Sequence, residues 1–142
     1  MQRGILLHSN QVSSSDIIES ILSIAKNTVT YCYTYPICFD NNEYIEGGKY
    51  TLDTLINLIR DNGGNIQETT IWGSGKHLNT ENIPHTYEEF YNSDYDIILD
   101  CADFEYLSVY SKSTLFLIKV MKKLASPLIN ISIVSDDIDI YF

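Results

Sequence analysis

The segment Gly73-Ser74-Gly75-Lys76 is the part of the chain most similar to a phosphate-binding loop. Such a loop needs another glycine five residues before Gly75 and a serine or threonine after the lysine, because these groups cradle phosphate and bind magnesium. The two positions hold Thr70 and His77. The segment therefore predicts a polar loop rather than a nucleotide site.

Three cysteines could supply a nucleophile: Cys32, Cys38 and Cys101. The flanking Asp100 and Asp103 would raise the pKa of the Cys101 thiol and so disfavour the reactive thiolate. Cys101 also falls on the apolar face of a predicted strand, where a free cysteine behaves as a small hydrophobe. We expect all three to be structural, and we predict no catalytic residue.

The three histidines do not form a recognisable metal motif. His77 and His85 stand eight residues apart with Glu81 between them, whereas structural zinc ligands usually come in closely spaced pairs. The acidic run 136–139 is better explained as a turn between strands than as a cation site. The sequence predicts no metal and no cofactor.

The acidic residues are concentrated between positions 81 and 111. This stretch holds eight carboxylates and no Lys or Arg, and five tyrosines are interleaved with them. Carboxylates can steer a basic partner and bind it through charge-assisted hydrogen bonds, and tyrosines supply rigid contact area. The residues that we expect to bind such a partner are Glu88, Tyr91, Asp96, Asp100, Glu105, Tyr106 and Tyr110. A solubilising role for the same charges is the alternative.

The overall composition limits the class of protein. The chain has 142 residues, the size of one domain, and 19 acidic residues against nine basic ones give a net charge of −10. This balance argues against binding to nucleic acid or to anionic membranes. We expect a cytoplasmic protein, because the cysteine number is odd and the start lacks a signal-peptide pattern.

The first two thirds of the chain alternate between helical and strand patterns. Two helices are expected, at 17–26 and at 52–59, the second capped by Thr51 and ended by Gly63 and Gly64. Strands are expected at 5–7, 29–35 and 66–72, with a hairpin arm over 37–44. The polar segment 73–84 is the best candidate for a mobile loop, and Thr86 and Glu89 have capping-box spacing for a short helix.

The last third predicts two strands, 95–102 and 106–111, joined by a three-residue loop. This loop places Ile97, Leu99 and Cys101 on one face with Leu107 and Val109, and sets position 96 opposite 112. A two-residue loop would bury a charge or expose an aliphatic side chain. A helix at 113–125 and strands at 128–134 and 138–142 follow. The sequence thus predicts a single α+β domain over residues 1–142, with a mixed or antiparallel sheet and three to four helices; an open α/β sheet is the alternative.

Three short segments of the sequence carry a family resemblance. They are Arg3-Gly4-Ile5, the segment 86–94 and Val109-Tyr110-Ser111-Lys112. Together they resemble an uncharacterised family of small single-domain proteins of Gram-positive bacteria; the resemblance is poor between residues 27 and 85. It implies a bacterial or phage-associated α+β protein and brings no catalytic residues.

Three functions remain open at this point. The first is a non-enzymatic interaction protein whose acidic surface binds a basic protein, such as a nuclease, toxin or defence protein, as an inhibitor, immunity or anti-defence protein. The second is a small-ligand-binding or enzyme domain built around the loop 73–85, with His77, Glu81 or His85. The third is a homodimer formed through the tyrosine-rich strand 29–35.

Overall fold

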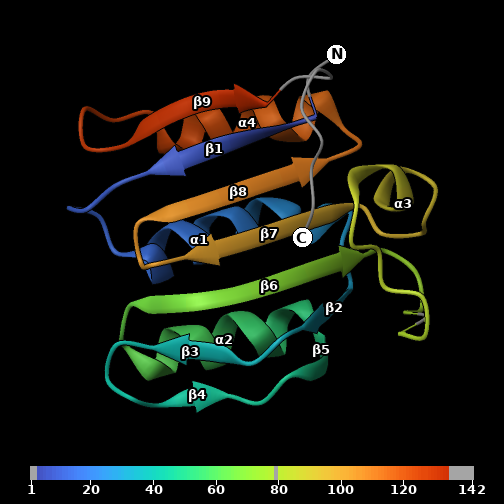
Figure 1. Ribbon diagram of the computed structural model, residues 1–142, viewed down its shortest axis with the longest axis horizontal. Coiled ribbons are helices and arrows are strands. Elements are labelled where there is room, and N and C mark those ends of the chain that lie inside the picture. The colour runs from blue at the N-terminus through green and yellow to red at the C-terminus, as the bar shows by residue number, and fades with distance from the viewer. Residues whose placement is uncertain (1–2, 79, 135–142) are drawn as a thin grey trace.

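A nine-stranded antiparallel sheet organises the described residues, 3–78 and 80–134, of the computed structural model (Figure 1). The strands are β1 Gly4–His8, β2 Tyr31–Thr34, β3 Ile37–Phe39, β4 Tyr44–Ile45, β5 Gly48–Thr51, β6 Ile66–Ser74, β7 Ile97–Ala102, β8 Tyr106–Ser111 and β9 Asn130–Val134. The α-helices are α1 Ser14–Ile24, α2 Leu52–Asn62, α3 Tyr87–Tyr91 and α4 Thr114–Leu124, with a 3-10 turn at Ala25–Asn27 after α1. The α+β class predicted from the sequence is confirmed.

The order of the strands is β4-β3-β6-β7-β8-β1-β9, and β2 lies between β5 and β6. Strand β2 is hydrogen-bonded along both sides, to β5 through Cys32–Tyr50 and to β6 through Cys32–Gly73. The hypothesis that segment 29–35 pairs with a second copy needs a free edge, and this strand does not offer one. We therefore set that route to a homodimer aside.

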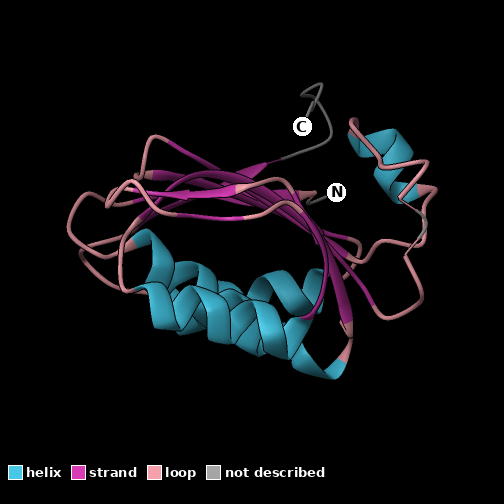
Figure 2. Ribbon diagram, turned by 90° about the horizontal axis from the view of Figure 1, so that it is seen from below, coloured by secondary structure: helices cyan, strands magenta, loops and turns pink. Residues whose placement is uncertain are grey.

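Three helices cover one face of the sheet. Figure 2 shows α1, α2 and α4 in a single layer beneath the strands, while α3 stands apart at one end. The Thr51 hydroxyl accepts a hydrogen bond from the Thr54 amide and caps α2, and Gly63 ends α2 in the left-handed region at φ 76°. Both boundaries are those expected from the sequence.

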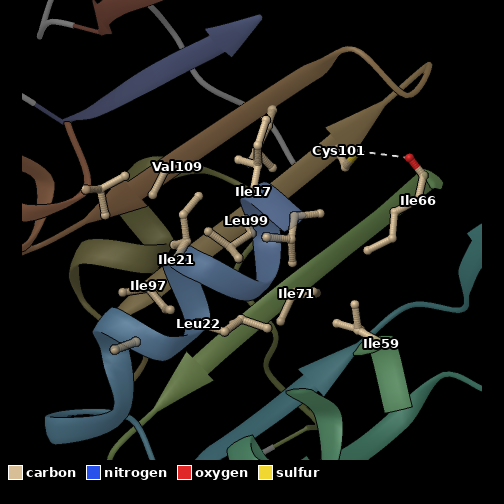
Figure 3. Packing of buried hydrophobic residues seen from close by; sticks show 14 of the residues in the cluster. Ile17, Ile21, Leu22, Ile59, Ile66, Ile71, Ile97, Leu99, Cys101 and Val109 are labelled. Atoms are coloured by element: carbon tan, nitrogen blue, oxygen red, sulfur yellow. Dashed lines mark hydrogen bonds between the residues drawn. The ribbon is translucent and has the colours of Figure 1, made fainter. Parts of the chain in front are cut away.

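The helix-side core fills the space between these helices and the sheet (Figure 3). It is almost wholly aliphatic: Ile21 and Leu22 of α1 contribute fully buried side chains, and so do Ile71 and Leu99 of the central strands. Period-two alternation in the strands and the helical period in α1 direct these side chains to the same layer.

The opposite face of the sheet, which we call the open face, carries a second and different cluster. This aromatic cluster comprises Trp72, Tyr87, Phe90, Tyr95, Ile98, Tyr110 and Val134. Its sheet residues form one row, because Trp72 pairs with Ile98, Ile98 with Tyr110, and Tyr110 with Gly4. A Cβ on Gly4 would lie 2.7 Å from the Tyr110 ring, so this position requires glycine. Helix α3 covers this row at one end of the sheet.

The β7–β8 hairpin has the predicted register. Leu99 pairs with Val109 and Ala102 with Tyr106, which leaves residues 103–105 as the three-residue loop. The structure also differs from the prediction in its boundaries: β6 continues to Ser74, and α1 begins at Ser14. Strand β5, which was not predicted, begins at Gly48 and pairs with β2. The strand predicted at 138–142 lies outside the described residues.

Candidate interaction surface

The seven residues predicted to bind a partner do not form one surface. Asp100, Glu105 and Tyr106 lie together on the open face toward the β7–β8 turn. Glu88 and the 55% exposed Tyr91 lie on α3 at the other end of the sheet.

The remaining two predicted residues have structural partners. Asp96 accepts a hydrogen bond from the Gly75 amide at 2.8 Å and lies close to the ammonium group of Lys112. Tyr110 is only 7% exposed within the aromatic cluster. Its ring is therefore covered by the protein itself and is not available as surface.

The turn end of the sheet gathers four carboxylates, which we call the acidic patch: Glu68, Asp100, Asp103 and Glu105. Glu68 lies near the beginning of β6 and Asp100 near the end of β7, whereas Asp103 and Glu105 lie in the turn between β7 and β8. The Phe104 amide donates to the Gln67 carbonyl at 3.2 Å, which holds the turn beside the start of β6. Among the described residues, no Lys or Arg makes an ion pair with any of the four.

Asp100 lies in a polar row of the open face. Across neighbouring strands Asp100 pairs with Thr70 and Ser108, and Ser108 pairs with Leu6. The Thr70 hydroxyl donates to the Asp100 carboxylate at 2.9 Å. Partial burial and then the negative charge of Glu68 raise the pKa of Asp100, against the opposing effect of that hydrogen bond. The carboxylates of the patch therefore repel one another, and the folded sheet holds them close together despite this repulsion.

The next row of the open face contains His8 and Tyr106, whose rings lie beside the patch. Tyr106 is 55% exposed and stacks on the His8 imidazole with ring centroids 4.6 Å apart. The Nε2 atom of His8 lies 3.3 Å from the Glu105 carboxylate. These contacts hold an exposed aromatic ring at a fixed position next to the carboxylates.

The turn itself has an unusual backbone. Asp103 and Phe104 both adopt left-handed conformations, with φ of 53° and 63°. Asp tolerates this region, but for a bulky residue such as Phe it is a strained choice, typically at a cost of about 1–2 kcal/mol. The Phe104 ring is nevertheless 38% exposed at the edge of the patch. A three-residue hairpin loop commonly contains a left-handed residue, so the turn itself calls for this conformation, although Gly or Asn would adopt it more readily than Phe.

Sequence reasoning missed Glu68 and Phe104 as members of this surface. Glu68 is distant in sequence, and only the pairing of β6 with β7 brings it near Asp100. A signal for Phe104 existed, because a phenylalanine stood in a turn where Gly or Asn is usual. Its left-handed backbone was not predicted.

Two of the three cysteines, Cys32 and Cys101, have the surroundings of structural residues. Cys32 and Cys101 are buried, and all three cysteines are free. Burial raises the pKa of Cys32 to about 12, and burial together with the charges of Asp100, Asp103 and Glu68 raises the pKa of Cys101 to about 12. Thiols with such pKa values are poor nucleophiles at neutral pH.

A pocket of about 600 Å³ lies at the other end of the sheet, between the segment after β6 and α3. The three residues predicted to serve a ligand site there, His77, Glu81 and His85, all line it. His77 stacks on Tyr31 with ring centroids 5.2 Å apart, and His85 meets the Trp72 ring edge-on at 6.3 Å. Within residues 3–78 and 80–134, no group of three His, Cys, Asp or Glu side chains could hold a metal ion.

Within residues 3–78 and 80–134, no helix has both the length and the apolar character that a bilayer crossing requires.

Comparison with known proteins gives a family assignment. Neither the curated proteins nor the solved structures include one that matches this chain. Residues 34–141 match a family described as "Protein of unknown function (DUF2691)". The match includes the middle of the chain, where the sequence resemblance was poor, and it leaves out β1 and α1. Because it covers well over half of the chain, the protein belongs to this family of unknown function.

Proposed function

We propose that the protein is a non-enzymatic interaction protein whose acidic patch binds a basic protein partner. The observation that carries this proposal is the segregation of charge along β6 and β7. Glu68, Asp100, Asp103 and Glu105 gather at the turn end without a Lys or Arg ion pair in the described part of the chain.

At the opposite ends of β6 and β7, basic side chains lie beside the acidic ones. There Lys76 lies 3.5 Å from Asp94, and Lys112 donates a hydrogen bond to the Ser93 carbonyl and lies over the Phe90 ring. Acidic residues at this end are thus partly neutralised by neighbouring bases. At the turn end only Glu105 has a basic partner among the described residues, the His8 imidazole, so the four carboxylates can attract a cationic surface, which raises association rates and favours basic partners.

Exposed aromatic rings beside the charges support the same function. Tyr106, stacked on His8, and Phe104, held in a strained turn, supply rigid contact area. We propose that the partner is a nuclease, toxin or defence protein with a lysine- or arginine-rich face, and that the protein acts as an inhibitor, immunity or anti-defence protein. Its free thiols fit a cytoplasmic setting.

Two double variants with the same change in net charge test the proposal. Glu68→Lys with Glu105→Lys reverses charges in the patch, and Glu46→Lys with Asp61→Lys reverses exposed charges elsewhere. Tagged wild-type and variant proteins would be used to capture proteins from the native lysate at low and high salt, with identification by mass spectrometry. We expect a basic protein to bind wild type and the control variant, to be lost with the patch variant, and to dissociate as salt rises.

The controls separate recognition from solubility. If the patch charges only keep the protein soluble, both double variants will capture the same proteins in the same amounts. Equal capture by the patch and control variants would contradict the proposed function.

A further inference from the structure

We propose that the protein forms a symmetric dimer through strand β9, which lies at one edge of the sheet. Strand β9 pairs with β1 on one side, and on its other side it pairs with no strand in the described part of the chain (Figure 1). An unpaired strand edge offers backbone N–H and C=O groups that a second strand can bind. This edge is distinct from the acidic patch, whose carboxylates belong to β6, β7 and the β7–β8 turn.

The two edges of the sheet differ in how they discourage such pairing. At the opposite edge, Glu46 and Gly47 interrupt the chain between β4 and β5, and Lys49 of β5 is exposed. Breaks and charges of this kind protect sheet edges against association. Strand β9 has five residues and contains no charged residue, no proline and no glycine. The β9 edge therefore lacks the protection that the opposite edge has.

Apolar side chains follow the β9 edge on the helix side of the sheet. Ile133 pairs with Ile5 and Ile131 pairs with Leu7, and both of these β1 residues belong to the helix-side core. Ile133 is nevertheless 62% exposed, since β9 has no further neighbour among the described strands. Pairing with another strand would bring apolar side chains against this isoleucine.

Helix α4 extends the same apolar surface. Lys119 and Lys123 mark the flank of α4 that faces α1, because each lines a surface hollow together with Ile24 of α1. Ile118 and Met121 lie on the other flank, since consecutive helical residues are about 100° apart, and both are partly exposed. Because α4 lies behind β9 at the edge of the sheet (Figure 1), this uncharged flank adjoins the unpaired strand.

A second copy of the chain fits this edge. When two β9 strands pair antiparallel about Ser132, Ile133 of each copy faces the partner's Ile131, and no like charges are opposed. Residues 112–134 carry four Lys and no Asp or Glu, so a chain of net charge −10 meets the least repulsion from its own copy here. The same lysines repel a basic protein, which disfavours the partner of the acidic patch as the occupant of this edge.

Analytical ultracentrifugation over a range of protein concentrations tests this proposal. Five residues of strand and one helix flank make a small interface, so we expect a weak dimer that dissociates at low micromolar concentration. Ile133→Lys should weaken dimerisation at least about tenfold. Tyr44→Lys, at a 65% exposed side chain of the opposite edge, adds the same charge and should change dimerisation less than about twofold. Circular dichroism checks that both variants remain folded.

A disulfide between the two copies tests the register. In a Cys38→Ser background, Ser132→Cys should form a covalent dimer on air oxidation, because opposed residues of antiparallel strands have Cα atoms about 4.5–5.5 Å apart. Added salt should strengthen the non-covalent dimer by screening the negative charges of the two chains.

Three results would overturn the proposal. The first is a wild type that stays monomeric at high concentration, as it would if another segment of the chain or another protein covered the edge. The second is equal dimerisation of the two Lys variants, or no disulfide from Ser132→Cys. The third is a dimer that salt weakens, since this would indicate binding of the acidic patch to the lysines of the other copy.

Discussion

The helix-side core and the open face lie on opposite sides of one sheet, but they are built from different residues. The helix-side core is aliphatic and is closed along its length by α1, α2 and α4. The open face begins with an aromatic row at the α3 end and changes to polar rows toward the β7–β8 turn. One side of the sheet thus provides stability, and the other combines an aromatic end that α3 covers with an acidic end over which none of the described helices lies.

The largest effect is expected from Ile21→Ala in the helix-side core. Ile21 is fully buried on α1 between the helices and the sheet, so the variant loses apolar burial and leaves a cavity. We expect the free energy of unfolding to fall by about 2–5 kcal/mol, measured by urea denaturation with circular dichroism. Ile133→Ala, at a 62% exposed side chain, should change it by less than about 0.5 kcal/mol. A similar loss for both variants would contradict the assignment of the core.

A smaller global effect is expected from Phe90→Ala in the aromatic cluster. Phe90 is fully buried, but α3 has five residues and covers one end of the sheet, so it can detach while the sheet persists. A Phe→Ala change in a core typically costs about 3–5 kcal/mol. Because α3 can open locally, we expect a loss of only about 1–2 kcal/mol in the free energy of unfolding, with a red shift in the emission of Trp72, the single tryptophan.

Tyr91→Ala is the matched control for this variant, because Tyr91 follows Phe90 on α3 and is 55% exposed. It should leave both the emission of Trp72 and the unfolding curve nearly unchanged. If Phe90→Ala destabilised the protein more than Ile21→Ala, the two sides of the sheet would not differ as described.

These differences show what the sequence could and could not predict. Period-two alternation placed Leu99 and Val109 on one face correctly, because burying a charge on the helix side would be costly. The same alternation put Tyr110 with Asp100 on the other face, but it could not show that α3 covers the tyrosine. That contact depends on how the chain returns over the sheet after β6.

The membership of the acidic patch was also hard to predict, because it depends on pairing between strands that are far apart in the sequence. Glu68 and Asp100 are 32 positions apart, and only the β6–β7 ladder brings them close. Local pattern predicts which face a side chain occupies, whereas the order of the strands decides which charges meet on that face. For this reason the sequence predicted an acidic surface but assigned Asp96 and Tyr110 to it and omitted Glu68.

Asp100→Asn tests the electrostatic cost of the patch and is expected to have a modest effect. The native pKa of Asp100 is raised, so between its unfolded pKa and its native pKa the native state binds more protons, and stability falls as pH rises through that window. Asn keeps an acceptor for Thr70 but carries no charge. We expect Asp100→Asn to increase stability near neutral pH by no more than about 1 kcal/mol, because solvent screens a half-buried group.

Thermal melts between acidic and neutral pH measure this effect. The gain of Asp100→Asn over wild type should disappear at pH values below the unfolded pKa of the carboxyl group, where wild-type Asp100 is protonated in both states. Asp103→Asn, at an exposed turn position, is the control and should show a smaller pH-dependent gain. A gain from Asp100→Asn that does not change with pH would contradict the electrostatic explanation.

The smallest effect is expected from alkylation of the three thiols, which compares their accessibility in the native protein. Cys32 and Cys101 are buried with pKa values of about 12, whereas Cys38 in β3 is partly exposed. We expect iodoacetamide to modify Cys38 first in the native protein and the other two only after unfolding, as followed by peptide mass spectrometry. Native modification of Cys101 at the rate of Cys38 would show that the helix-side core is open.

The affinity for a captured and purified basic partner tests the central proposal most directly. Calorimetry would compare wild type with the patch variant, Glu68→Lys with Glu105→Lys, and with the control variant, Glu46→Lys with Asp61→Lys. We predict that the patch variant binds at least about tenfold more weakly, while the control variant stays within about twofold of wild type. Equal losses of affinity in the two variants would contradict recognition by the acidic patch.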